Sequence, residues 1–379
     1  MTAPRHPAAP APGPIRQVVL QSTGFCNIDC AYCYLPDRLT RTVMPLDIVR
    51  ATARALADSG LLAPAVEVRW HAGEPLTVPR SFYSQAHALL RGALGDRTRL
   101  SFSLQTNGLL LDGAWADFLR HEEVRVGVSL DGPAQVHDAH RRTRSGAGTL
   151  TRALKGVSHL VGAGLSYDVI SVVTPATLAH TGAYLDFMAE LAPRSLGLNP
   201  EETEGGNDSG LHRADGFEQE YRAFLHRVAR WSERTGVEVR ELAAMRRHVL
   251  HHALPVHNTQ NEPLSIVTVG ADGRVSSFSP ELFGWTSERY GDFVIGRVND
   301  PGFRFDRWPE TFRLLASDVE RGRAGCERSC SYYAVCGGGA PANKWAECGD
   351  MAATCTAFCS LGVMAVADVV LDELETARR

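Results

Sequence analysis

Between residues 16 and about 235, short apolar runs alternate with longer segments in which apolar residues recur at helical spacing. The short runs are rich in Val, Leu and aromatic residues, as buried strands are. We predict strands at 17–21, 66–70, 100–105, 124–130, 167–173 and 195–199. Helices are predicted between and after them, at 45–59, 80–93, 112–121, 149–163, 177–191 and 215–234.

Alternating strands and helices predict an α/β fold with a parallel sheet, because a helix between two strands lets both run in the same direction. Six such units, over residues 16–235, predict a partial (β/α)6 barrel of the TIM type. In sheets of this kind, ligands bind at the carboxyl ends of the strands. Polar motifs that follow the strands are therefore candidates for one common site.

Three segments flank the predicted barrel. Residues 1–15 are rich in Pro and Ala, and we expect a disordered leader. Residues 236–300 are predicted to form a bridge, with a helix at 240–252 and a hairpin whose strands, 264–269 and 274–278, flank an Ala-Asp-Gly turn. Residues 301–379 contain most of the cysteines and end in a predicted helix at 363–376, so we expect a small separate domain there.

Composition narrows the classes of function. The formal net charge of −4 gives no basis for binding nucleic acid. No apolar run reaches the length of a signal peptide or a membrane span, so a cytoplasmic protein without a membrane partner is expected. In that compartment, nine cysteines favour metal or redox chemistry over disulfides.

Cys26, Cys30 and Cys33 follow the first predicted strand with the spacing C-x3-C-x2-C. A closed zinc site takes four protein ligands, whereas three thiolates suit a [4Fe–4S] cluster with one iron left open. A zinc knuckle and three unrelated buried thiols are the alternatives. With Tyr32 before the last cysteine, the motif resembles the signature of radical S-adenosylmethionine (SAM) enzymes, in which the open iron chelates the amine and carboxylate of SAM.

Later strand ends carry further polar motifs: HAGEP at 71–75, QTNG at 105–108, and SLDG at 129–132 followed by basic residues at 140–144. Each alone is typical of a turn, but together they follow successive strands behind the cysteine loop. The first resembles the G-G-E-P motif of radical SAM enzymes, which holds the amino group of SAM, with Ala72 in place of a glycine. The resemblance implies that Gly73, Glu74, Asn107, Ser129 and Arg141 contact SAM, with Arg142 or Arg144 as alternatives to Arg141.

The remaining cysteines are Cys326, Cys330, Cys336, Cys348, Cys355 and Cys359. Three glycines follow Cys336 and allow backbone amides to approach sulfur, which stabilises the charge of a cluster. The pattern resembles the SPASM region of radical SAM peptide-modifying enzymes, which carries auxiliary iron–sulfur clusters. Two-cluster members place a cysteine near residue 279, where this chain has serine. The resemblance therefore implies one auxiliary [4Fe–4S] cluster on Cys326, Cys330, Cys336 and Cys359, with Cys355 or Cys348 as alternatives to Cys359, whereas the segment alone also fits a zinc ribbon.

Several longer runs, at 20–38, 70–76, 125–132, 199–205, 278–282 and 336–344, resemble cyclophane-forming radical SAM/SPASM maturases of Gly-rich ribosomal peptides. The resemblance implies a C–C cross-link between an aromatic side chain and the β-carbon of a nearby residue, made through a 5′-deoxyadenosyl radical. The auxiliary cluster would accept the released electron, and Asp131 and Glu204 are candidates by position for the base. The implied partners are a precursor peptide and an electron donor of the flavodoxin or ferredoxin type.

Two other functions remain open. One is a different SPASM modification, such as thioether formation or oxidation of a substrate Ser or Cys, since the bond type depends on the precursor peptide. The other is a non-catalytic iron–sulfur redox protein, which would not cleave SAM.

Overall fold

The computed structural model describes residues 10–36, 38–205, 207, 209, 216–250 and 255–377. Its main sheet has ten strands in the order β12-β11-β10-β1-β3-β4-β5-β7-β8-β9. Six of them pair in parallel and in chain order: β1 (Ile15–Leu20), β3 (Leu62–Trp70), β4 (Arg99–Thr106), β5 (Val124–Ser129), β7 (Tyr167–Val173) and β8 (Ser195–Pro200). This confirms the predicted α/β partial barrel, and the short β9 (Glu238–Val239) adds to its far edge.

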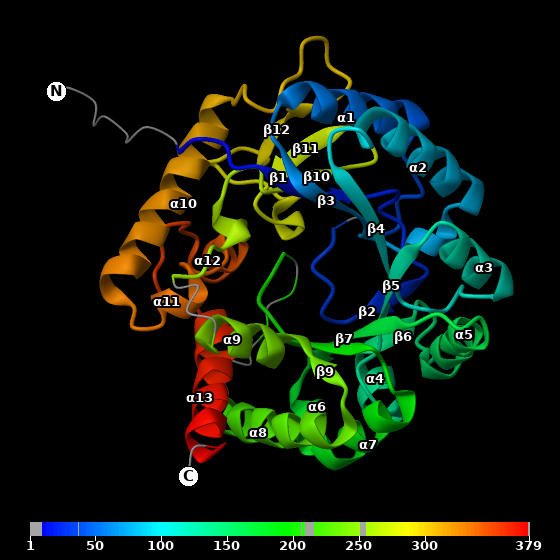
Figure 1. Cartoon of the computed structure of the whole chain (residues 1–379), viewed down its shortest axis with the longest axis vertical. Helices are drawn as coiled ribbons and strands as arrows, with labels where there is room; N and C mark the ends of the chain where they lie inside the picture. The colour runs from blue at the N-terminus through cyan, green and yellow to red at the C-terminus, as the bar shows by residue number, and fades with distance from the viewer. Residues whose placement is uncertain are drawn as a thin grey trace.

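Helices cover the outer side of these strands (Figure 1). They are α1 (Leu46–Ser59), α2 (Arg80–Leu94), α3 (Gly113–His121), α4 (Ala134–His140), α5 (Leu150–Gly162), α6 (Pro175–Ala179), α7 (Thr181–Leu191) and α8 (Phe217–Thr235). The helix predicted at 177–191 is thus two helices, because Thr174 and Thr177 form a capping box that begins α6 at Pro175 and His180 interrupts the helical backbone.

The strands have one apolar and one polar face, and this positions the site. In β5, Val124, Val126 and Val128 are buried, whereas Arg125 and Ser129 alternate with them. Because successive side chains of a strand point to opposite faces, the apolar set packs under the helices and the polar set lines the inside of the barrel. The interior is therefore suited to a polar ligand.

The predicted hairpin extends the barrel sheet. Its first strand, β10 (Ile266–Val269), pairs in parallel with β1, followed by β11 (Arg274–Ser277) and β12 (Val294–Arg297) in antiparallel order. The sequence predicted the hairpin but gave no sign of its pairing with β1, which covers an edge that would otherwise expose unpaired backbone groups. The preceding helix is α9 (Arg240–Leu250), and residues 251 and 252 of the predicted helix lie outside the described residues.

The C-terminal segment contains α10 (Glu310–Ser329), α11 (Tyr333–Cys336), α12 (Pro341–Cys348), the π-helix η5 (Cys359–Met364) and α13 (Ala365–Ala377). The C-terminal helix lies beside α8 and α9 (Figure 1), and Arg246 of α9 pairs with Glu373 of α13 at 2.6 Å.

The start of the chain differs slightly from prediction, since β1 begins at Ile15 and residues 1–9 lie outside the described part.

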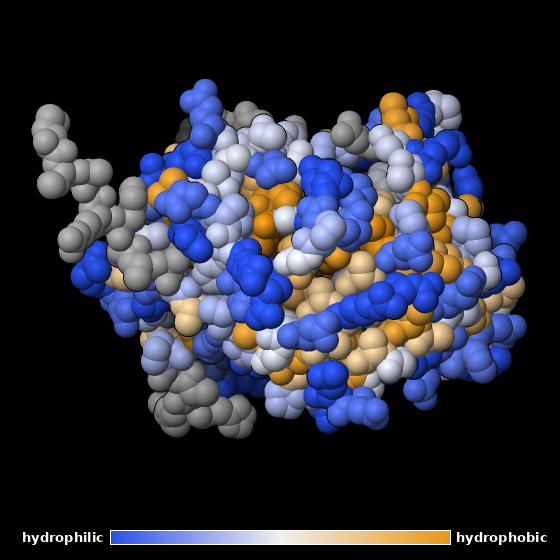
Figure 2. Space-filling model, turned by 90° about the horizontal axis from the view of Figure 1, so that it is seen from above, coloured by the Kyte–Doolittle hydropathy of each residue, from blue (hydrophilic) through white to orange (hydrophobic). Residues whose placement is uncertain are grey.

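The remaining elements are the small sheet β2 (Ile28–Cys30) with β6 (Arg141–Thr143), and the 3-10 helices η1 (Pro75–Thr77), η3 (Thr259–Asn261) and η4 (Pro280–Leu282). Figure 2 shows a face on which hydrophilic and hydrophobic side chains are mixed. Within the described ranges, we find no helix with the length and apolar character needed to cross a membrane.

Candidate functional site

The first three cysteines lie at one end of the barrel, in the loop between β1 and α1. Part of this loop forms β2, which pairs with β6 so that Cys30 lies opposite Arg141. Cys26, Cys30 and Cys33 all line one cavity of about 470 Å³, together with the predicted SAM contacts Gly73, Glu74, Asn107, Ser129 and Arg141. In the described part of the chain, no three His, Cys, Asp or Glu residues are grouped for a single metal ion. A [4Fe–4S] cluster does not need such a group, because each thiolate binds a different iron.

The electrostatic surroundings of the thiols suit a bound cluster. Burial, with a smaller contribution from Glu74, raises the pKa of Cys26 to about 12, and burial raises the pKa of Cys30 to about 11. Asn107 Nδ2 lies 3.8 Å from the Cys26 sulfur, and Arg141 Nη1 lies 3.8 Å from the Cys30 sulfur. Such thiols ionise when a metal supplies the compensating charge, and polar hydrogens around the sulfurs then stabilise the thiolates.

Glu74 is a buried carboxylate that has no cationic partner among the described residues. Its oxygens accept hydrogen bonds from Thr106 Oγ1 (2.7 Å), Asn107 N (2.8 Å) and Leu76 N (3.0 Å), all of them neutral donors. Burial raises its pKa to about 7, against the effect of these hydrogen bonds. No described residue forms an ion pair with it, so the site suits an ammonium group, such as the amine of SAM.

Gly73 brings the Glu74 loop against the chain that leads into the cysteines. Its φ is +57°, and a Cβ there would lie 2.5 Å from the carbonyl oxygen of Phe25. The backbone of Glu74 in turn donates to the same oxygen at 2.7 Å. Only glycine allows this approach, which explains the glycine of the sequence motif.

Of the three candidate arginines, Arg141 lines the cavity, whereas Arg142 and Arg144 are exposed. Its guanidinium forms two hydrogen bonds with Asp131, from Nε to Oδ2 at 2.8 Å and from Nη2 to Oδ1 at 3.2 Å. Burial alone would raise the pKa of Asp131, but the charges of Arg141 and His137 and the hydrogen bonds outweigh it and hold this pKa below its usual value. Asp131 therefore orients Arg141, and its lowered pKa disfavours uptake of a proton, while its role as a base stays a prediction.

The same cavity has an acidic wall, which we define as Glu201, Glu202, Glu204 and Glu281. Burial raises the pKa of Glu202. Burial also raises the pKa of Glu204, and repulsion by the charge of Glu202 adds to this effect, so that the pKa of Glu204 lies well above its usual value. Burial likewise raises the pKa of Glu281 to about 7. The sequence singled out Glu204 of this set, whereas Glu281 comes from η4, and only folding brings that helix to the barrel mouth.

Tyr34 and His71 line the same cavity and were also missed. The Tyr34 hydroxyl lies 3.0 Å from His71 Nε2. Their positions gave a signal that could have been used, since Tyr34 directly follows Cys33 and His71 begins the motif of Glu74. Burial lowers the pKa of His71 to about 4, so its ring is neutral near pH 7.

The second group of cysteines forms a separate small cavity. Cys326, Cys330, Cys336 and Cys359 line it, whereas Cys348 and Cys355 are exposed and do not. Backbone N of Gly339 donates to the Cys336 sulfur at 3.1 Å, and Thr356 Oγ1 donates to the Cys359 sulfur at 3.2 Å. The structure thus brings together the four cysteines that the sequence grouped and separates the two alternatives from them.

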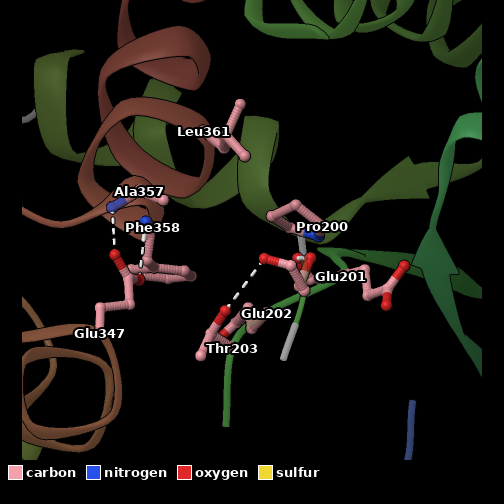
Figure 3. A pocket seen from close by; sticks show the side chains of 9 residues that line it. Pro200, Glu201, Glu202, Thr203, Glu347, Ala357, Phe358 and Leu361 are labelled. Atoms are coloured by element: carbon pink, nitrogen blue, oxygen red, sulfur yellow. Dashed lines mark hydrogen bonds between the residues drawn. The ribbon is translucent and has the colours of Figure 1, made fainter. Parts of the chain in front are cut away.

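Helix α12 and its surroundings link this second cavity to the acidic wall. Asn343 donates to Glu202 Oε2 at 2.6 Å, and the adjacent Lys344 donates to the Cys326 sulfur at 3.6 Å. Figure 3 shows residues 200–203, at and after the end of β8, on one side of a small pocket that Ala357, Phe358 and Leu361 also line. There Glu347 accepts hydrogen bonds from the backbone N of Ala357 and Phe358, just before Cys359.

Comparison with known proteins agrees with this geometry. Residues 20–199 match the model of the Radical SAM superfamily. The protein sll1766 of Synechocystis sp. is 35% identical, over 96% of this chain and 93% of its own length. The serine-type anaerobic sulfatase-maturating enzyme of Klebsiella aerogenes is 34% identical over 48% of this chain, and the match spans only 45% of that enzyme.

Solved structures share the fold over almost the whole chain. Native anSMEcpe with bound AdoMet superposes with a TM-score of 0.74 at 18% identity, covering 96% of this chain and 99% of that one. Streptococcus suis SuiB bound to S-adenosylmethionine gives a TM-score of 0.62 at 13% identity, covering 92% and 77%. At these identities the likeness concerns the fold alone. Together with the family match and the full-length relative, it shows that the chain belongs to the radical SAM superfamily, whose members bind a [4Fe–4S] cluster and SAM.

Proposed function

We propose that the protein is a peptide maturase that forms a C–C cross-link, a cyclophane, between an aromatic side chain and the β-carbon of a nearby residue in a ribosomally made precursor peptide. One observation carries this proposal: the cavity that holds the SAM-type site also has an acidic wall, which α12 links to a second site of four cysteines. Relatives support a peptide substrate, since anSMEcpe has been solved with a Cp18Cys peptide and SuiB with its precursor peptide SuiA.

One half of the cavity would bind SAM. Cys26, Cys30 and Cys33 would hold the cluster, Glu74 would receive the amine of SAM, and Arg141 would receive its carboxylate. Ser129, which accepts a hydrogen bond from Gln105 Nε2 at 2.9 Å, would hold the ribose. When bound, the cluster and SAM supply the 5′-deoxyadenosyl radical that removes a hydrogen atom from the substrate.

The acidic wall of the cavity would take up the proton that the aromatic ring loses. Closing a bond from the β-carbon to an aromatic ring requires the ring to lose one electron and one proton. We assign the proton to Glu204, because it lines the cavity and because burial beside Glu202 raises its pKa. Asp131, held by Arg141, is the weaker base.

The electron would pass to an auxiliary [4Fe–4S] cluster held by Cys326, Cys330, Cys336 and Cys359. Lys344 supports this assignment. It is only 2% exposed, and among the described residues its ammonium group forms no ion pair with a carboxylate and donates a hydrogen bond to the Cys326 sulfur. A buried positive charge needs a compensating negative charge, and a thiolate-bound cluster provides one.

The test is to incubate reconstituted enzyme with SAM, dithionite and a short peptide that is rich in Gly and aromatic residues and is encoded beside the gene. We expect 5′-deoxyadenosine and a product lighter by two hydrogens, with the new bond mapped by tandem mass spectrometry between a ring and a β-carbon. Glu204→Gln should keep SAM cleavage and lose most cross-linking. If the new bond is made to a sulfur atom, the protein forms thioethers and not cyclophanes. If no 5′-deoxyadenosine is formed, the protein is instead a non-catalytic redox protein.

A further inference from the structure

A basic and apolar patch lies on the surface over the first cysteine loop. We define this cluster-loop patch as Arg38, Leu39, Arg41 and Val43 with Arg142 and Arg144. Five large hydrophobic side chains are exposed in the described part of the chain, and two of them are here: Leu39 at 69% and Val43 at 42% exposure. The two side chains belong to one loop and lie among arginines, and an exposed apolar patch rimmed by polar residues marks an interaction site.

The patch is bonded directly to the backbone of the cysteine loop. Arg144 Nη2 donates to the carbonyl oxygens of Cys26, at 3.0 Å, and Arg38, at 2.8 Å. Arg38 Nη1 donates to the carbonyl oxygen of Cys30 at 3.1 Å. A protein docked on this patch is therefore close to the thiolates that hold the first cluster.

Positive charge dominates the patch, although the whole chain carries a net charge of −4. Arg38 pairs with Asp29 at 2.8 Å, and Arg144 is 4.0 Å from the same carboxylate. Arg41 lies over the ring of Phe25 at 4.2 Å. Arg142 donates to the carbonyl oxygen of Asp138 at 2.8 Å. Of the four arginines, Arg38 and Arg144 lie within 4.0 Å of a described carboxylate, that of Asp29, and Asp37 of the same loop lies outside the described residues.

We propose that the cluster-loop patch docks an acidic electron-carrier protein, which supplies the electron for SAM cleavage. This inference rests on the proposed function, because the redox-protein alternative needs no such delivery. One electron leaves the reduced donor and enters the site of Cys26, Cys30 and Cys33, so the donor is oxidised and that site reduced by one electron. Opposite charges steer the encounter, and a small apolar contact suits a transient redox complex.

The test compares two reductants on Arg41→Glu and Leu39→Asp, two residues outside the SAM site. With reduced flavodoxin, formation of 5′-deoxyadenosine should fall by about tenfold or more in Arg41→Glu, and its dependence on salt should weaken. With dithionite, which needs no docking, the rate should match the parent. Arg227→Glu, an exposed arginine of α8, is the matched control and should behave as the parent with both reductants.

Each other outcome overturns the proposal. Equal loss with both reductants would show damage to the cluster loop, and no loss with either would place the donor elsewhere. A raised KM for the peptide with normal flavodoxin kinetics would make the patch a peptide surface. A parent enzyme that makes no 5′-deoxyadenosine with dithionite would instead refute the proposed function itself.

Discussion

Ala72 adopts a backbone conformation that favours glycine. Its φ is +81°, in the left-handed region, and its side chain is 3% exposed. The left-handed conformation costs a residue with a Cβ about 1 to 2 kcal/mol. The alanine noticed in the sequence as a departure from G-G-E-P is thus a small local strain beside Gly73.

We expect Ala72→Gly to raise the free energy of unfolding by about 1 kcal/mol, since it relieves this strain. The neighbouring Gly73→Ala should do the reverse and lower it by about 2 kcal/mol or more, because the new Cβ would lie 2.5 Å from the carbonyl oxygen of Phe25. Denaturant unfolding of both variants measures this. A neutral or destabilised Ala72→Gly would mean that the methyl group contributes more by packing than its backbone costs.

Lys344 leads to a spectroscopic prediction. A positive charge beside Cys326 stabilises the more negative, reduced form of a cluster, so Lys344→Met should lower the midpoint potential of the proposed auxiliary cluster by tens of millivolts. Redox titration followed by electron paramagnetic resonance measures it, with the exposed Lys155→Met as control. An unchanged potential would contradict ligation by Cys326 at this position.

Glu281 makes stability depend on pH. Its pKa is raised from the usual 4.5 to about 7, so the folded protein binds this proton more tightly than the unfolded chain does. The resulting stabilisation is fully present below pH 4.5 and is lost as the pH rises through about 7 and the group ionises. Glu281→Gln should therefore stabilise the metal-free protein by about 1 to 3 kcal/mol at pH 8 and little at pH 4.5. Thermal unfolding at both pH values, with the exposed Glu288→Gln alongside, checks this. Equal stabilisation at both values would point to a cause other than ionisation.

At the scale of elements, the π-helix η5 positions Cys359, the proposed fourth ligand of the second site. Such helices are rare and often occur at functional sites. η5 begins at Cys359, and the hydrogen bonds that Glu347 accepts from Ala357 and Phe358 fix the turn before it. Cys359 is buried there, whereas Cys355, four residues earlier, is exposed.

We therefore expect Cys359→Ser to reduce the iron content of reconstituted enzyme from about eight to about four atoms per chain. Cys355→Ser and Cys348→Ser should each keep the parent's iron. SAM cleavage should persist in all three, because the first cluster is untouched. Iron analysis that showed the loss in Cys355→Ser instead would reassign the ligand.

At the scale of the whole molecule, the sheet joins regions that the sequence predicted as separate. β10 pairs with β1 from Gln17 to Leu20, and α13 packs on α8 and α9. A fragment of residues 10–235 would expose the β1 edge and the buried faces of the barrel helices. We expect this fragment to aggregate or to lack cooperative unfolding, and the full chain to unfold in one transition by calorimetry. A fragment that folds alone would restore the predicted boundary at residue 235.

Much of the site was predictable because local sequence and strand order suffice for it. Cys26, Glu74, Asn107 and Arg141 each follow a strand or lie near its end, and parallel strands bring these ends to one edge of the sheet. The sequence placed Arg141 in the site by resemblance alone and left Arg142 and Arg144 as alternatives. The choice of Arg141 follows from the register of β6 against β2, which turns one side chain inward and leaves its neighbours exposed.

The sequence by itself determined the barrel, the cysteine loop and the grouping of cysteines into two sites. These features depend on short-range periodicity and on ligand spacing, which the chain carries locally. Only the tertiary structure decided which groups share the cavity. Asp131 pairs with Arg141, which disfavours it as a proton acceptor, and Glu281 shares the cavity with Glu204 because the hairpin pairs with β1. Such contacts depend on the packing of segments far apart in the chain, and no local pattern encodes them.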